Sequence, residues 1–117
     1  MNRSFAYICA PTSYDGRISK RLKEYSRELY DLGYLPICPS MMFSQFLSGD
    51  VAQERNDLST MSQEILRRCR VVVVCSNDVS DDMEKDILLA KRIGIVTTTL
   101  AGIRKTAAIT TKGENDE

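Results

Sequence analysis

The sequence contains no histidine. That absence removes the serine–histidine and cysteine–histidine pairs by which many enzymes activate a nucleophile. A zinc site would need thiolates from Cys9, Cys38, Cys69 and Cys75, which are scattered along the chain without a C-x-x-C pair. We therefore expect no metal and no cofactor, and we assign any acid–base chemistry to carboxylates, tyrosine, lysine or cysteine.

The sequence also lacks an excess of charge and a long apolar run. The 16 Lys and Arg residues balance 16 Asp and Glu residues, which argues against binding to duplex nucleic acid. No run reaches the roughly 18 apolar residues of a membrane span, and the first residues do not resemble a signal-peptide core. Three cysteines lie in apolar runs typical of reduced, buried thiols, so we expect a cytoplasmic protein.

The 117 residues correspond to one domain, which is large enough to bury a hydrophobic core. Apolar runs predict four strands, over residues 5–9, 34–38, 71–75 and 95–100. Helical periodicity predicts three main helices, over residues 17–32, 53–69 and 81–93. This alternation is typical of a parallel sheet with right-handed crossovers.

We expect a three-layer, flavodoxin-like α/β fold. Its open parallel sheet would have the strand order 2-1-3-4, with helices on both faces. A fifth strand is compatible with this arrangement. Residues 1–100 would form the domain. Residues 101–117 would form a C-terminal arm, with a short helix up to residue 111 and then a frayed tail.

Residues 41–47 are apolar on nearly all sides. One interpretation is a short core helix. The other is a lid or a subunit contact, because methionine and phenylalanine are common at adaptable surfaces and interfaces.

One carboxylate lies in an unusual position. On the helix that follows the four valines at 71–74, Met83, Ile87 and Ala90 define a buried face; Asp86 falls inside that face and Asp82 on its flank. A carboxylate facing the core is costly without a partner or ligand, and the carboxyl end of a parallel strand is where ligands bind. Asp86 is therefore a candidate site residue, or else it pairs with backbone N–H groups or an internal arginine or tyrosine.

Other polar groups are expected near the same edge of the sheet. Tyr7, Pro11 and Ser13 lie at the end of the first strand and in its following turn, which lacks the G-x-x-x-x-G-K pattern of a Walker loop. Ser80 lies in the turn before the acidic helix, and Glu54 projects toward the inner side of the helix at 53–69.

Several segments resemble the small nucleoside 2-deoxyribosyltransferase-like proteins of bacteria and phages, over roughly residues 5–100. The matching segments are YICAP (7–11), GYLPICP (33–39), FSQFL (43–47), SDDMEKDI (80–87) and AKRIGI (90–95). Such relatives usually carry Ser-x-Gly-Met-x-x-Glu-Ile after the third strand. Ser80 and Met83 agree with this motif, while Asp82 stands at its glycine and Asp86 at its nucleophilic glutamate.

The resemblance implies cleavage of the N-glycosidic bond of a nucleoside or nucleotide, or transfer of its deoxyribosyl group. Asp86 would be the nucleophile, oriented by Tyr7, and Asp82 or Glu54 would act as acid toward the leaving base or hold the sugar hydroxyls. Tyr7, Pro11, Ser13 and Ser80 would line the substrate pocket. The resemblance also implies a homodimer or larger homo-oligomer, in which a neighbouring subunit completes the pocket.

A second hypothesis is a sensor or sequestering protein that binds a nucleotide or nucleoside derivative without turning it over. The aspartates at the glutamate and glycine positions of the motif motivate it. A third hypothesis, compatible with both, is an interaction protein whose segment 41–47 forms an oligomer interface.

Overall fold

The computed structural model describes residues 2–11 and 20–115, with side chains as far as residue 107. Four parallel strands form one sheet in the order β2-β1-β3-β4, which confirms the predicted order. The described residues contain no fifth strand. The strands are β1 (Phe5–Cys9), β2 (Leu35–Ile37), β3 (Val71–Val74) and β4 (Val96–Thr99).

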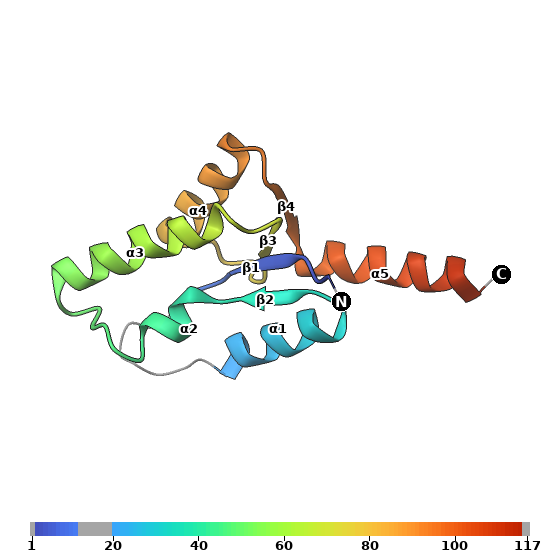
Figure 1. Cartoon of the computed structure of the whole chain (residues 1–117), viewed down its shortest axis with the longest axis horizontal. Helices are drawn as coiled ribbons and strands as arrows, with labels where there is room; N and C mark the ends of the chain where they lie inside the picture. Colours follow the sequence, from blue (N-terminus) through green and yellow to red (C-terminus); the bar gives the residue numbers. More distant parts are fainter. Residues whose placement is uncertain (1, 12–19, 116–117) are drawn as a thin grey trace.

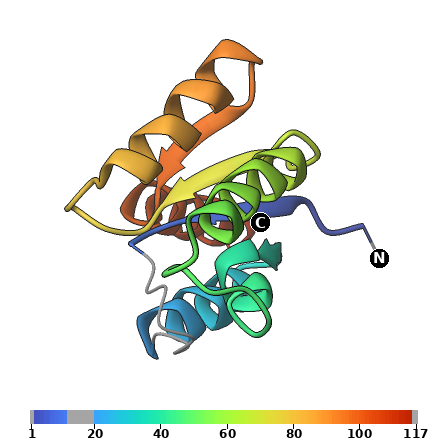
Figure 2. The same ribbon diagram turned by 90° about the vertical axis from the view of Figure 1, so that its left-hand side faces the viewer.

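Helices cover both faces of the sheet, so the predicted α/β three-layer architecture is confirmed (Figures 1 and 2). Two of them, α1 (Lys20–Asp31) and α5 (Leu100–Asn115), pack on one face. The other face is covered by α3 (Ala52–Leu66) and α4 (Asp81–Arg92). The short helix α2 (Pro39–Phe43) lies between β2 and α3 in the chain.

The valines of β3 lie at the centre of the core. Because side chains alternate along a strand, Val71 and Val73 face α1 and α5, whereas Val72 and Val74 face α3 and α4. Full burial of each such side chain stabilises the fold by about 1.5–3 kcal/mol. A strand buried on both faces thus explains the run of four valines.

Short-range signals set the end of α1 and both ends of α4. Gly33 and Gly94 adopt positive φ angles of 95° and 80° just after α1 and α4, a backbone conformation that glycine adopts without steric cost. At the start of α4 the Ser80 hydroxyl accepts a hydrogen bond of 3.3 Å from the Met83 N–H. Acidic residues fill the first turn of α4, and Lys91 and Arg92 occupy its last turn, which suits the helix dipole.

Helices α3 and α5 end three and four residues away from the ends that the sequence predicts. The helix expected to reach residue 69 ends at Leu66, because the Arg70 N–H already donates to the Phe5 carbonyl and joins the chain to the sheet. Helix α5 continues past residue 111 to Asn115, with only Gly113 as an unfavourable residue in that turn. Figure 1 shows its second half projecting beyond the sheet, which gives the chain a long axis of 56 Å.

The apolar segment 41–47 combines features of both interpretations. Its start belongs to the short helix α2, and Phe43 is buried as expected for a core residue. Met42 and Phe46 are exposed, as expected for a contact surface. Across the described residues, no helix combines the length and the apolar character needed to cross a bilayer.

Candidate functional site

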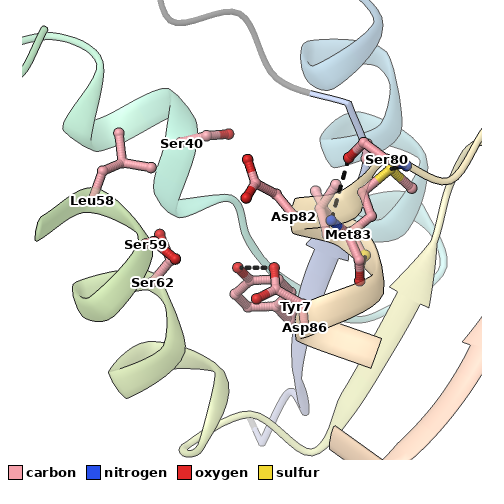
Figure 3. A pocket seen from close by; sticks show the side chains of 12 residues that line it. Tyr7, Ser40, Leu58, Ser59, Ser62, Ser80, Asp82, Met83 and Asp86 are labelled. Carbon is pink, nitrogen blue, oxygen red and sulfur yellow. Dashed lines mark hydrogen bonds between the residues drawn. The ribbon is translucent and has the colours of Figure 1, made fainter. Parts of the chain in front are cut away.

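Asp86 lies where α4 meets the carboxyl half of β1. The alternation of β1 directs Tyr7 toward the α3/α4 face, and α4 places Asp86 above it. The Tyr7 hydroxyl donates a hydrogen bond of 3.0 Å to Asp86 Oδ2 (Figure 3). Asp86 Oδ1 has no hydrogen-bond donor among the described side chains and backbone, and the residue is half-buried. One carboxylate oxygen is therefore fixed and the other is available.

The surroundings of Tyr7 and Asp86 raise the pKa values of both side chains. Burial raises the pKa of Asp86 from 3.8 to about 6; the Tyr7 hydrogen bond lowers it, and the charge of Asp82 adds a further increase. Burial, followed by the negative charge of Asp86 and the hydrogen bond to it, raises the pKa of Tyr7 far above its ordinary value. Tyr7 is thus a permanent donor, and Asp86 changes its protonation state just below neutral pH.

A small cavity opens beside the two residues, with a volume of about 50 Å³. Its near wall consists of residues 7–9 of β1 and Ala10 after it, and of Ser80, the N-cap of α4, with Asp82, Met83 and Asp86 from α4 itself. The end of a parallel strand and the beginning of a helix meet here, as in other open α/β sheets. Two of the predicted site acids, Asp86 and Asp82, therefore share one cavity with Tyr7 and Ser80 (Figure 3).

The far wall adds hydroxyl groups that the sequence did not reveal. It is formed by Ser40 of α2 and by Leu58, Ser59 and Ser62 of α3. Ser62 is only 7% exposed, yet its hydroxyl forms no hydrogen bond to any described residue. On the helical wheel of α3, Ser62 falls between the inward-facing Ile65 and Leu66. The same wheel count that identified Asp86 would have identified Ser62.

Two other predicted site residues, Glu54 and Pro11, lie outside the cavity. The Glu54 carboxylate accepts a hydrogen bond of 3.1 Å from the Ser48 N–H, near the beginning of its own helix, and does not line the cavity. Pro11 is exposed and lines a separate depression next to Tyr25 and Ser76. Ser13 lies outside the described residues.

The cavity therefore offers oxygen-based chemistry. Cys9 also lines it, but burial and then the Asp86 charge raise the pKa of this thiol to about 12, so it stays a thiol. In the described part of the chain, no three cysteine, aspartate or glutamate residues are placed to hold a metal ion. Two carboxyl groups, one phenol and several hydroxyls suit a carboxylate nucleophile or the binding of a polyhydroxylated ligand.

A family model described as a domain of unknown function, DUF7768, matches residues 4–100, so the chain belongs to this family. The matched segment includes the whole sheet and every residue that lines the cavity. A search of the curated proteins found no match.

Proposed function

We propose that this DUF7768 domain cleaves the N-glycosidic bond of a nucleoside or nucleotide, or transfers its deoxyribosyl group, with Asp86 as the nucleophile. The main support is the arrangement of Asp86 and Tyr7 in the cavity. The 3.0 Å hydrogen bond holds Oδ2, while Oδ1 accepts no hydrogen bond from the described residues, and Asp86 lines the same cavity as Asp82 and Ser62. The motif that resembles the deoxyribosyltransferases aligns its nucleophile with the same residue.

In the proposed reaction, Asp86 Oδ1 attacks the anomeric carbon of the sugar. The carbon–nitrogen bond breaks, its electron pair leaves with the base, and the base takes up a proton from water at the mouth of the cavity. The product is a glycosyl ester on Asp86. Water or a second base then attacks the same carbon and releases a proton to the solvent, the ester bond breaks, and the carboxylate is restored.

The electrostatics of the site support this role. A carboxylate with a pKa of about 6 is mostly ionised at pH 7.5 and more basic than an ordinary aspartate. The Tyr7 donor fixes its orientation, since the phenol keeps its proton. Placement within a few tenths of an ångström matters, because a displacement of about 1 Å can lower a rate about a hundredfold.

The other polar groups suit the sugar. Asp82 lines the cavity close to Asp86, and the Ser62 and Ser59 hydroxyls face both from α3 (Figure 3). A ribose or deoxyribose carries hydroxyls that donate to carboxylates and accept from serine. We assign Asp82 and the two serines to the sugar, and the leaving base to the mouth of the cavity.

The test is base release from a panel of deoxynucleosides and their 5′-monophosphates, followed by chromatography. We expect release by the wild type and loss of at least a thousandfold in Asp86→Ala. Asp81→Asn, at an exposed acid in the first turn of the same helix, serves as control and retains activity. No release by the wild type, or equal release by Asp86→Ala, contradicts the nucleophile assignment.

A second candidate is a binding module that retains the pocket without turnover. The observation in its favour is Asp82, which lines the cavity together with Asp86. Its side chain adds bulk and negative charge where the related motif has glycine, which hinders the attack on the sugar while the remaining polar groups still bind a ligand. Tight binding in calorimetry without base release selects this alternative.

We also propose that the chain forms a homodimer or larger homo-oligomer. Met42 of α2 and Phe46, in the turn that follows α2, are 52% and 66% exposed and form an apolar patch. The ring of Phe46 packs edge-on against buried Phe43, with the ring centroids 6.0 Å apart, so the patch is anchored to the core. Ser40, which belongs to α2 like Met42, lines the cavity, so a neighbouring subunit on this patch would lie close to the cavity.

A further inference from the structure

A groove continues from the candidate site to the protein surface between α3 and α4. It has a volume of about 400 Å³ and is lined by Ala52, Arg55, Asn56, Ser59, Asp82 and Lys85. Ser59 and Asp82 line both the groove and the cavity of Asp86. The two spaces therefore adjoin, and their combined volume falls within the range of small-molecule sites.

The chemical character of the groove changes along its length. On the α4 wall the order from inside to outside is Asp86, Asp82 and Lys85, and on the α3 wall it is Ser62, Ser59 and Arg55. Exposure rises in the same direction, from buried Ser62 and half-buried Asp86 to exposed Arg55 and Lys85. Carboxyl and hydroxyl groups thus line the inner end, and two cations line the outer end.

Among the residues whose side chains are described, neither cation has a carboxylate partner. Arg55 donates a hydrogen bond of 2.8 Å to the Gly49 carbonyl, which carries no net charge. Lys85 forms no hydrogen bond or ion pair within the residues whose side chains are described. Two cations at the outer end of one groove attract an anion, and the two acids further in repel it. The groove therefore orients an anionic ligand with its charged group outward.

We propose that the substrate of this site is a nucleoside 5′-monophosphate, whose phosphate lies between Arg55 and Lys85 while its sugar faces Asp86. The inference rests on the proposed function, because it assigns the sugar to the same cavity. An arginine guanidinium and a lysine ammonium are the usual partners of a phosphate monoester. The carboxyl groups of Asp82 and Asp86 favour the neutral sugar at the inner end.

The test compares binding of the four deoxynucleosides with that of their 5′-monophosphates by calorimetry at pH 7.5. We expect at least one monophosphate to bind about tenfold or more tightly than its nucleoside, because its phosphate would form charge-assisted hydrogen bonds with Arg55 and Lys85. Lys85→Glu and Arg55→Glu should each reduce this preference about tenfold or more. Lys23→Glu removes an exposed cation on α1 and should leave the preference unchanged; far-UV spectra and Arg55→Ala check for effects on folding.

Base release, measured in parallel, separates the two proposals. Monophosphate binding that depends on Arg55 and Lys85 but yields no free base upholds the phosphate site and contradicts the nucleophile role. Base release that is equal for nucleosides and monophosphates, and unaffected by both charge reversals, contradicts the phosphate site and upholds the nucleophile role. Absence of any nucleotide binding overturns the phosphate site.

Discussion

The Tyr7 hydroxyl and Asp86 Oδ2 are 3.0 Å apart, although 79 positions separate the two residues in the sequence. This hydrogen bond joins the first strand of the sheet to the helix after the third strand. Tyr7 lies almost fully within the core, with 4% of its surface exposed. Its phenol therefore spans from the apolar sheet to the cavity and fixes a carboxylate that the fold has partly removed from water.

Asp86→Asn is expected to stabilise the protein at neutral pH. The folded-state pKa is raised from 3.8 to about 6, so the native state binds the proton more tightly than the unfolded state does. Ionised Asp86 thus destabilises the fold above pH 6, by an upper estimate of roughly 3 kcal/mol at about 1.4 kcal/mol per pH unit. This penalty declines as the pH falls from 6 and vanishes below about 4. Asparagine can still accept the Tyr7 hydrogen bond.

Urea denaturation of wild type and Asp86→Asn between pH 4 and pH 8 measures the difference. We expect about 1–3 kcal/mol in favour of the variant at pH 7.5 and near equality at pH 4. Asp81→Asn is the matched control, since this exposed residue loses only a favourable helix-dipole interaction of about 0.3–1 kcal/mol. A variant that is less stable than the wild type at pH 7.5 would show that the Asp86 charge stabilises the fold.

Tyr7→Phe is expected to raise the pKa of Asp86 further. The hydrogen bond from Tyr7 lowers that pKa while burial raises it, so removal of the hydroxyl leaves burial unopposed. Carbon-detected NMR titration of the Asp86 carboxyl group measures the change directly. If the proposed reaction occurs, the acidic limb of its pH profile moves upward by the same amount.

Tyr30→Phe is the control for this experiment, because Tyr30 is exposed and its ring contacts Arg3 and Arg27 without involving the site. It should leave the Asp86 titration unchanged. At pH 8 the Tyr7 variant should also lose about 1.5–3 kcal/mol of stability, the value of a hydrogen bond to a charged group. An unchanged Asp86 titration would mean that the 3.0 Å contact contributes nothing to its electrostatics.

The fold was predictable because its signals are local. Four consecutive valines fit only a strand buried on both faces, and Gly33 and Gly94 mark helix ends through their backbone conformation. The end of α3 was not predictable, since it depends on a hydrogen bond from Arg70 to Phe5 across the sheet. Periodicity describes one helix at a time and does not include such distant partners.

The candidate site was only half predictable for the same reason. Asp86 stands out because a carboxylate on a buried helix face is rare and costly. Ser62 occupies an equally buried face on α3, but a small hydroxyl is common in cores and gives a weak signal. These two faces meet across one cavity because α3 packs next to α4. No local sequence pattern predicts that packing.

Ser62→Ala is expected to leave stability nearly unchanged while weakening ligand binding. The Ser62 hydroxyl forms no hydrogen bond to a described residue, so its removal loses no contact within the fold and changes stability by less than about 0.5–1 kcal/mol. Ser80→Ala provides the contrast, because that hydroxyl caps α4 and its loss costs about 1 kcal/mol. Denaturation and nucleotide calorimetry on both variants test this. Marked destabilisation by Ser62→Ala would assign the hydroxyl a structural role instead.

Phe46→Ser combined with Met42→Gln is expected to dissociate the proposed oligomer. Both side chains are more than half exposed, and association would remove their apolar surface from water at about 25 cal/mol per Å². Light scattering at micromolar concentration should give at least a dimer for the wild type and a monomer for the double variant. Leu88→Ser is the control, since Leu88 is 57% exposed on α4 and outside this patch. A monomeric wild type contradicts the oligomer, and a dimer that survives the double substitution moves its interface away from Met42 and Phe46.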